Sequence, residues 1–193
     1  MITEEQYIKA SRAIERIHET DPNLLTENAA SIAAEKLYSR RMLSVLDLVQ
    51  TNSPYSLKIA AQCQHLKRWG VPRSEYPYDR RGYHLWRRAV MEYQVELTRQ
   101  VLNESEIEES EIVVILDALK DQGNKSNINA TIIMDTACLV FLKWHLVPFS
   151  AKHESVKVID ILRKTMKKMS EKGLQKLNAM EFDEQVKELL NMI

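Results

Sequence analysis

The sequence predicts an all-α protein that folds as a single domain over residues 1–193. Four glycines and five prolines in the whole chain disfavour a turn-rich β fold. Apolar residues recur at helical spacing through most of the sequence. A hydrophobic content of 45% and a charged content of 28% are ordinary values for a globular chain that buries a core. We therefore expect one bundle of about seven or eight helices.

Three helices are expected in the N-terminal half, at about residues 4–19, 27–50 and 54–69. Thr3 is a suitable N-cap for the first of them, and "DPN" ends it. Gly70 ends the third. The next stretch, "GVPRSEYPYDRRGY", is long and irregular and lies in the middle of the domain. Long ordered loops in compact domains are often functional, so this loop is a candidate site.

Five further helices are expected, at about residues 83–103, 108–121, 128–146, 152–172 and 182–192. The second of these contains "EIVVIL", which alone would also suit a short strand. The third is apolar nearly all round, which is typical of a helix at the centre of a bundle. Basic residues followed by Gly173 predict the end of the fourth.

Composition indicates a cytoplasmic protein that does not enter a membrane. Lys and Arg number 27, as do Asp and Glu, so the net charge argues for no class of partner. Cys63 and Cys138 form no CxxC pair, which predicts free thiols in a reducing compartment. The N-terminus has no signal-peptide pattern, and the longest apolar run falls short of the roughly 20 residues of a membrane span.

Two ionisable residues lie within apolar helical segments. His65 is one, and a lone histidine in such a place is more often a satisfied core residue than a ligand. Asp135 is the other, between "TIIM" and "TACLVFL" in the most apolar predicted helix. Because an unpaired buried carboxylate is very costly, we expect Asp135 to face a cation, a metal ion or a helix N-terminus.

Arginine and aromatic residues are concentrated in the segment 65–88. Its arginines are Arg68, Arg73, Arg80, Arg81, Arg87 and Arg88. Guanidinium groups suit phosphate or carboxylate, and aromatic faces stack on a base or on a guanidinium. The segment therefore predicts anion binding, unless its arginines pair with nearby carboxylates and only clamp the loop. A second basic stretch follows at residues 161–173.

Five blocks of sequence are distinctive together: "IERIHETDPN", "EKLYSRRM", "AAQCQHLKRWGVPRSEYPYDRRGYHLWR", "DTACLVFL" and "VKVIDILRKTMKKMSEKG". In this order they resemble the family called domain of unknown function 4202, over roughly residues 14–180. Their layout is also similar to HD-type phosphohydrolases, which are all-α domains that hold a divalent metal ion. That resemblance implies an HD-like bundle in which His65, Gln94 and Asp135 hold a divalent metal ion.

The function that the resemblance implies is a metal-dependent hydrolase, or a degenerate pseudo-enzyme, acting on a phosphorylated small molecule or nucleotide. His65 and Asp135 would be catalytic, because the metal they hold would lower the pKa of a bound water. The residues expected to bind substrate are Arg68, Arg73 and Arg81 at the phosphate, Tyr83 and Trp86 at the remaining part, and Arg163 and Lys164 closing the site.

Two positions depart from the HD pattern. Gln94 stands where the resemblance predicts histidine, and Met134 where it predicts an acidic residue. An amide oxygen is a weak ligand for a transition metal, and the missing acid removes a possible proton carrier. Either Glu92 or Glu96 compensates, or the pocket persists without turnover. The alternative is a non-catalytic protein- or RNA-binding module that uses segment 65–88, although zero net charge argues against broad nucleic-acid binding.

Overall fold

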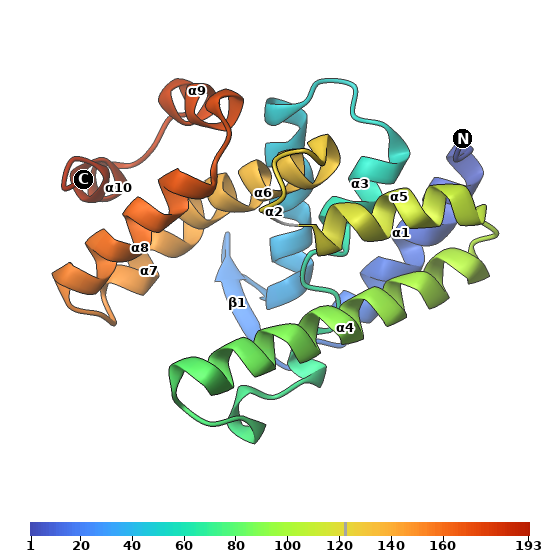
Figure 1. Cartoon of the computed structure of the whole chain (residues 1–193), viewed down its shortest axis with the longest axis horizontal. Helices are drawn as coiled ribbons and strands as arrows, with labels where there is room; N and C mark the ends of the chain where they lie inside the picture. Colours follow the sequence, from blue (N-terminus) through green and yellow to red (C-terminus); the bar gives the residue numbers. More distant parts are fainter. Residues whose placement is uncertain (122) are drawn as a thin grey trace.

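Helices make up most of the computed structural model, which describes residues 1–121 and 123–193 (Figure 1). The predicted all-α class is confirmed, with ten α-helices in the described residues instead of seven or eight. They are α1 (Glu4–Glu19), α2 (Ala34–Val49), α3 (Tyr55–Gln62), α4 (Arg80–Glu104), α5 (Glu109–Lys120), α6 (Ile128–Val140), α7 (Leu146–Ser150), α8 (Ser155–Lys168), α9 (Glu171–Ala179) and α10 (Glu184–Leu190).

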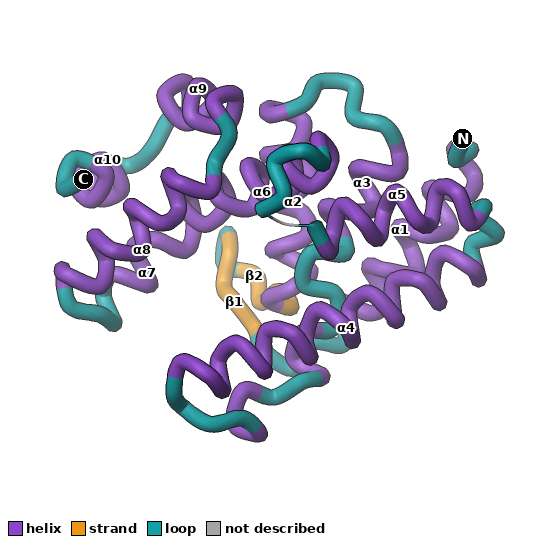
Figure 2. The backbone as a smooth tube through the Cα atoms, viewed as in Figure 1, coloured by secondary structure: helices purple, strands orange, loops and turns teal. Residues whose placement is uncertain are grey.

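The segment before α2 is a β-hairpin, so the predicted helix over 27–50 was wrong at its start. Strand β1 (Leu24–Glu27) pairs antiparallel with β2 (Ala30–Ala33), as Figure 2 shows. Asn28 and Ala29 between them have φ of 50° and 62°. Two successive left-handed residues make the tight turn that matches the twist of paired strands. The helix therefore begins only at Ala34.

Helix α3 ends at Gln62, seven residues before the predicted end at Trp69. Beyond it the backbone bonds from residue i to i+3, as in Leu66 N to Cys63 O at 3.1 Å. Lys67 has φ of 51°, a left-handed conformation that an α-helix cannot contain. The chain then continues as the short 3-10 turn η1 (Arg68–Gly70). His65 and Arg68 consequently lie on an irregular turn, not on a helix.

Helix α6 lies at the centre of the bundle, as its apolar composition predicted. It contacts α2, α3, α5, α8 and α9. It continues through a π-helical turn, η3 (Phe141–His145), into α7. By length and composition alone the run Ile128–Ser150 could cross a membrane, but core helices share those properties. A π turn often marks a functional site, because it changes the direction in which side chains project.

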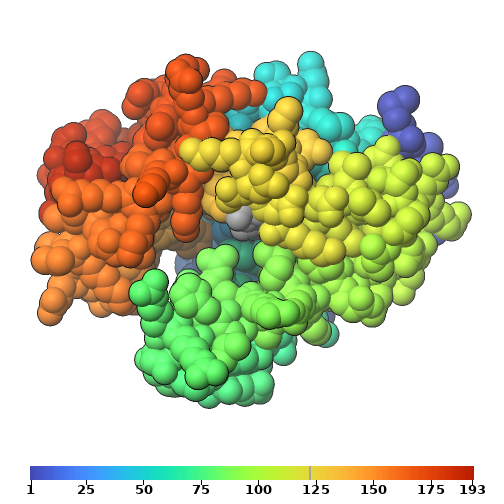
Figure 3. Space-filling view, viewed as in Figure 1, coloured from blue at the N-terminus to red at the C-terminus, as the bar shows by residue number. Residues whose placement is uncertain are grey.

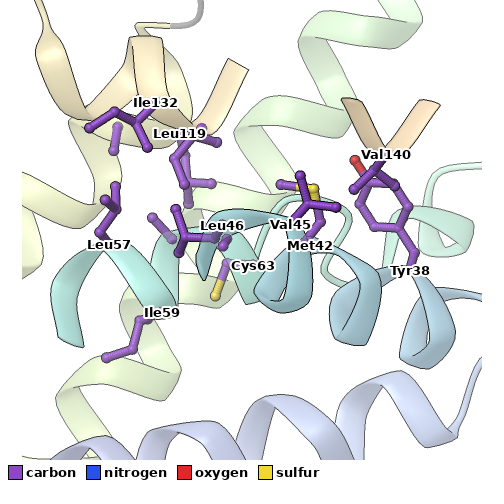
Figure 4. Close-up of a cluster of buried hydrophobic side chains, with 14 of the residues drawn as sticks. Tyr38, Met42, Val45, Leu46, Leu57, Ile59, Cys63, Leu119, Ile132 and Val140 are labelled. Carbon is purple, nitrogen blue, oxygen red and sulfur yellow. The ribbon is translucent and has the colours of Figure 1, made fainter. Parts of the chain in front are cut away.

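The main hydrophobic core lies between α2, α3, α5 and α6, and Figure 4 shows part of it around Met42, Leu46 and Cys63. Met42 and Leu46 are fully buried. Cys63 and Cys138 are free thiols, as predicted. Burial raises the pKa of each thiol to about 12, so both remain protonated and act as small apolar side chains.

A buried carboxylate divides the predicted helix over 152–172 into two. Asp135, which is only 1% exposed, accepts hydrogen bonds from Ser170 N at 2.8 Å and from Ser170 Oγ at 2.5 Å. Ser170 is the N-cap of α9, so Asp135 faces a helix N-terminus, one of the three expected partners. Helix α8 therefore ends at Lys168. Gly173 lies inside α9 and does not end a helix.

The close approach of α9 to Asp135 requires a residue without a side chain at position 173. A Cβ at Gly173 would collide with the Asp135 carboxylate. Alanine normally stabilises a helix interior by about 1 kcal/mol relative to glycine. We expect Gly173→Ala to destabilise this protein instead, by about 1–3 kcal/mol, because of overpacking. Chemical denaturation measures the change.

The matched control is the same substitution in an Asp135→Ala background. Without the carboxylate the clash is absent, so Gly173→Ala should then become neutral or stabilising. A loss of equal size in both backgrounds would mean that Asp135 does not determine the need for glycine.

Candidate functional site

A cavity of about 490 Å³ opens between the N-terminal half of α4 and helix α8, where the surface in Figure 3 is hollowed. Helices α2 and α6 and the turn after α3 form its inner wall. The lining residues are Tyr38, Gln64, His65, Arg68, Tyr83, Trp86, Arg87, Val90, Met91, Gln94, Met134, Ala137, Cys138, Phe141, Phe149, Ile161, Thr165 and Lys168. We call this space the main chamber.

Positive charge dominates the main chamber. Arg68, Arg87 and Lys168 line it from three separate elements, and no aspartate or glutamate does. Within residues 1–121 and 123–193, none of these three cations forms an ion pair. The neighbouring Arg88, in contrast, pairs with Glu92 at 2.8 Å and lies outside the chamber. The chamber therefore presents three cations that form no direct ion pair with a carboxylate of the described residues.

Aromatic and imidazole groups fix the position of Arg68. Its guanidinium carbon lies 4.9 Å from the centre of the Trp86 ring, a cation–π distance. Trp86 is itself anchored, because its indole N–H donates to the carbonyl oxygen of Val71 at 2.9 Å. Arg68 Nη1 also lies 3.1 Å from His65 Nε2. Arg68 is thus held in one orientation before any ligand binds.

His65 links Arg68 to Glu35, a half-buried glutamate on α2. Its Nδ1 lies 3.1 Å from Glu35 Oε2, and its ring stacks on Tyr38 with centroids 4.1 Å apart. Arg68 can only donate hydrogen bonds, so His65 Nε2 must be the acceptor in this contact. The proton of the neutral ring is therefore on Nδ1, which donates a hydrogen bond to Glu35 Oε2. His65 is therefore neutral and Glu35 ionised.

The pKa values of this pair agree with that assignment. Burial lowers the pKa of His65, and the charges of Arg68 and Arg87 lower it further against the opposing effect of Glu35. For Glu35, burial raises the pKa, but His65 and Arg68 outweigh it and hold the pKa of the carboxyl below its ordinary value.

A second chamber of about 430 Å³ adjoins the main chamber. Its lining residues are Leu25, Ala34, Glu35, Tyr38, His65, Arg68, Ala137, Phe141 and His145. Burial lowers the pKa of His145 to about 4, helped by the charge of Arg41, so this imidazole is neutral near pH 7. The sequence alone gave no role to His145. The π turn η3 contributes both Phe141 and His145 to this chamber.

The structure brings together five of the residues predicted to form the site: His65, Arg68, Tyr83, Trp86 and Gln94 all line the main chamber. The others lie elsewhere. They are Arg73, Arg81, Asp135, Arg163 and Lys164, none of which lines either chamber.

Two of the remaining basic residues have partners outside the chambers. Arg73 donates to the carbonyl oxygens of Tyr76 and Pro77 at 2.8 and 2.7 Å, so it clamps its own loop through carbonyls. Lys164 pairs with Asp160 at 2.6 Å on the exposed side of α8.

The residues expected to hold a divalent metal ion do not form a suitable site. Both oxygens of Asp135 accept hydrogen bonds from Ser170, and both nitrogens of His65 face Glu35 and Arg68. Only Gln94 remains, as a neutral amide among cations. The described part of the chain contains no cluster of three or more His, Cys, Asp or Glu side chains that could hold a metal. Glu92 and Glu96 are exposed and do not line the chambers.

Several residues that line the chambers were not identified as site residues from the sequence. Glu35 and Tyr38 are three apart on α2 and therefore share a face, a spacing that could have paired them. Arg87 and Lys168 belong to the two basic stretches, but neither was among the residues chosen as substrate-binding from those stretches. The helical spacing of Tyr83, Arg87 and Val90 places Arg87 on one face of α4 and could have distinguished it from Arg88.

Comparison with known proteins gives one family. The family model described as Domain of unknown function (DUF4202) matches residues 8–190. No curated protein and no solved structure matches the chain. The matched range contains every residue that lines the two chambers.

The neutral histidines make the fold sensitive to acid. Below the ordinary histidine pKa of about 6.5 the unfolded chain gains protons that folded His145 does not. The free energy of unfolding should therefore fall by about 1.4 kcal/mol per pH unit for each such histidine, down to the folded pKa of about 4 for His145. Denaturant titrations between pH 7.5 and 4.5 measure this slope.

Two histidine substitutions distinguish the effect of His145 on this slope from a general effect of acid on the fold. His145→Gln should flatten the slope, whereas His84→Gln, at an exposed position on α4, should leave it unchanged. Identical slopes for the two variants would contradict the conclusion that His145 makes the stability depend on pH.

Proposed function

The chain belongs to the family described as Domain of unknown function (DUF4202), and we propose that its main chamber binds a phosphorylated small molecule or a nucleotide. The observation that carries this proposal is the set of three cations, Arg68, Arg87 and Lys168, around a chamber whose lining contains no carboxylate. Like charges held together repel one another, and a phosphate between them removes that repulsion. The guanidinium groups also match phosphate oxygens in geometry.

The rest of the lining supports a ligand with a ring or another partly apolar group. The chamber volume of about 490 Å³ lies in the range that suits small ligands. Tyr83, Phe149 and Val90 supply apolar and aromatic surface. Gln64 and Gln94 also line the chamber, and each has a buried amide nitrogen without a hydrogen-bond partner in the described residues. Because an unmade buried hydrogen bond is costly, these amides favour a polar ligand atom at the wall.

Metal-dependent hydrolysis by an HD-like bundle remains a prediction from the resemblance and is not part of this proposal. Residues 1–121 and 123–193 offer a divalent ion no cluster of three His, Cys, Asp or Glu ligands, and the three cations oppose its entry. Binding of the phosphate group requires only the protein's own cations, so we propose recognition without a metal ion. His65, oriented by Glu35, contributes by holding Arg68 in place.

A protein- or RNA-binding module is the second candidate, and one observation favours it. Arg80 and Arg81 are exposed at the start of α4, and the nearby Tyr78 is 81% exposed. Exposed arginine and tyrosine suit both kinds of partner. These residues lie outside both chambers, so such binding would not depend on Arg87 or Lys168.

Phosphate binding should depend on the cations that face the chamber. We expect Arg87→Ala and Lys168→Ala each to weaken the affinity for AMP and for inorganic phosphate by about tenfold, because each removes a charge-assisted contact. Calorimetric titration at constant ionic strength measures the change. Arg88→Ala and Lys167→Ala are the matched controls, since both are exposed neighbours outside the chamber. Equal losses in lining and control variants would reject the chamber as the site.

Binding should also survive removal of metal ions. We expect the affinity for AMP to be the same before and after dialysis against EDTA, because Arg68, Arg87 and Lys168 supply the positive charge. Elemental analysis of the same samples records any metal that is lost. If chelation abolished binding, and His65→Ala lost the same metal, the hydrolase prediction would replace this proposal.

A further inference from the structure

The two chambers adjoin along a set of shared residues that includes Arg68. They share the lining residues Tyr38, His65, Arg68, Ala137 and Phe141. Arg68 is the one arginine or lysine among these shared residues. Its guanidinium lies against Trp86 of the main chamber and against His65, which lines both. A phosphate bound to Arg68 would therefore have room on two sides.

The charges of the two chambers differ. Arg87 and Lys168 line only the main chamber, so negative charge is favoured there. The second chamber instead contains Glu35, which is the only carboxylate among the described residues that line either chamber. This carboxylate is ionised and would repel a second anionic group at that end. A ligand that enters the second chamber must therefore continue beyond its phosphate with an uncharged or cationic group.

The second chamber is suited to a ring that carries hydrogen-bond donors. Tyr38, Phe141 and Leu25 give it aromatic and aliphatic walls. Glu35 receives the hydrogen bond from His65 at Oε2, and its Oε1 has no hydrogen-bond partner in the described residues. His145 lines the same space, and its buried Nε2 also has no partner among those residues. A hydroxyl or amino group on a ring could donate to Glu35.

We propose that the ligand carries a phosphate esterified on both sides, with the phosphate at Arg68, one organic group in the main chamber and an uncharged ring in the second. This inference rests on the proposed function and adds the class of ligand. The ligand is a phosphodiester, such as a dinucleotide, and not a phosphomonoester. The volumes of about 490 and 430 Å³ each lie in the range of small-ligand sites, so each chamber has room for one organic group.

The test compares probes that have one organic group with probes that have two. AMP is paired with the dinucleoside monophosphate ApA, and phenyl phosphate with diphenyl phosphate, so that the second pair removes any dependence on a base. We expect the probes with two organic groups to bind about tenfold more tightly in calorimetric titration, because they bury a second ring.

Filling the second chamber should abolish that gain. Leu25 lines the chamber, and Leu24, its neighbour on β1, does not. They are 41% and 63% exposed, and adjacent strand residues point to opposite faces. We expect Leu25→Trp to reduce the affinity for ApA to that for AMP, and Leu24→Trp to leave the difference intact. Ala34→Leu, which fills the chamber from α2, gives an independent variant, and circular dichroism melting confirms that each variant is folded.

Each outcome decides between the two proposals. If ApA and diphenyl phosphate bind no better than their monoesters, or if Leu25→Trp and Leu24→Trp behave alike, the two-sided ligand is wrong. The proposed function still stands in that case, provided that AMP binding depends on Arg87 and Lys168. If no phosphate-bearing probe binds, both proposals fail.

Discussion

The buried carboxylate of Asp135 constrains much of the C-terminal half of this fold. A charge at the centre of the most apolar helix would be very costly without partners, so another element must supply hydrogen bonds to it. The N-terminus of α9 does so through Ser170. That requirement breaks the chain between α8 and α9 and leaves Lys168 as the last residue of α8, at the edge of the main chamber. An interaction outside the chamber thus determines which lysine reaches it.

Carboxylates also hold the structure in place around the start of α2, on the other side of the main chamber from α8. Asp21 accepts a hydrogen bond from the backbone N–H of Glu35 at 3.0 Å and so ties the start of α2 to the "DPN" break. Glu35 then orients His65, and His65 and Trp86 hold Arg68. The two buried aspartates, Asp21 and Asp135, thus both accept hydrogen bonds from backbone N–H groups. Glu35 acts on Arg68 through His65, and the three cations of the main chamber form no direct ion pair within the described residues, although the chain as a whole has no net charge.

The helices were predictable where local sequence alone determines them, and the site was predictable only in part. The Thr3 N-cap and the apolar α6 follow from short patterns, and both were found. The end of α3 was not predictable, because the left-handed Lys67 conformation has no signal such as glycine. Asp135 was correctly expected to need a partner. Its assignment to a metal site came from the resemblance, whereas α9 is the partner that its position on α6 provides.

The three cations of the main chamber affect both the stability of the fold and the ions that it attracts. Arg68, Arg87 and Lys168 place like charges around one chamber, and their mutual repulsion is only a small cost to folding because solvent screens the exposed Arg87 and Lys168. Natural proteins retain such unfavourable arrangements where function requires them, because selection maintains only sufficient stability. An anion that binds only the folded chain reverses the loss by mass action. The same repulsion disfavours a divalent cation, so the charge distribution that supports phosphate recognition also argues against a metal ion in this chamber.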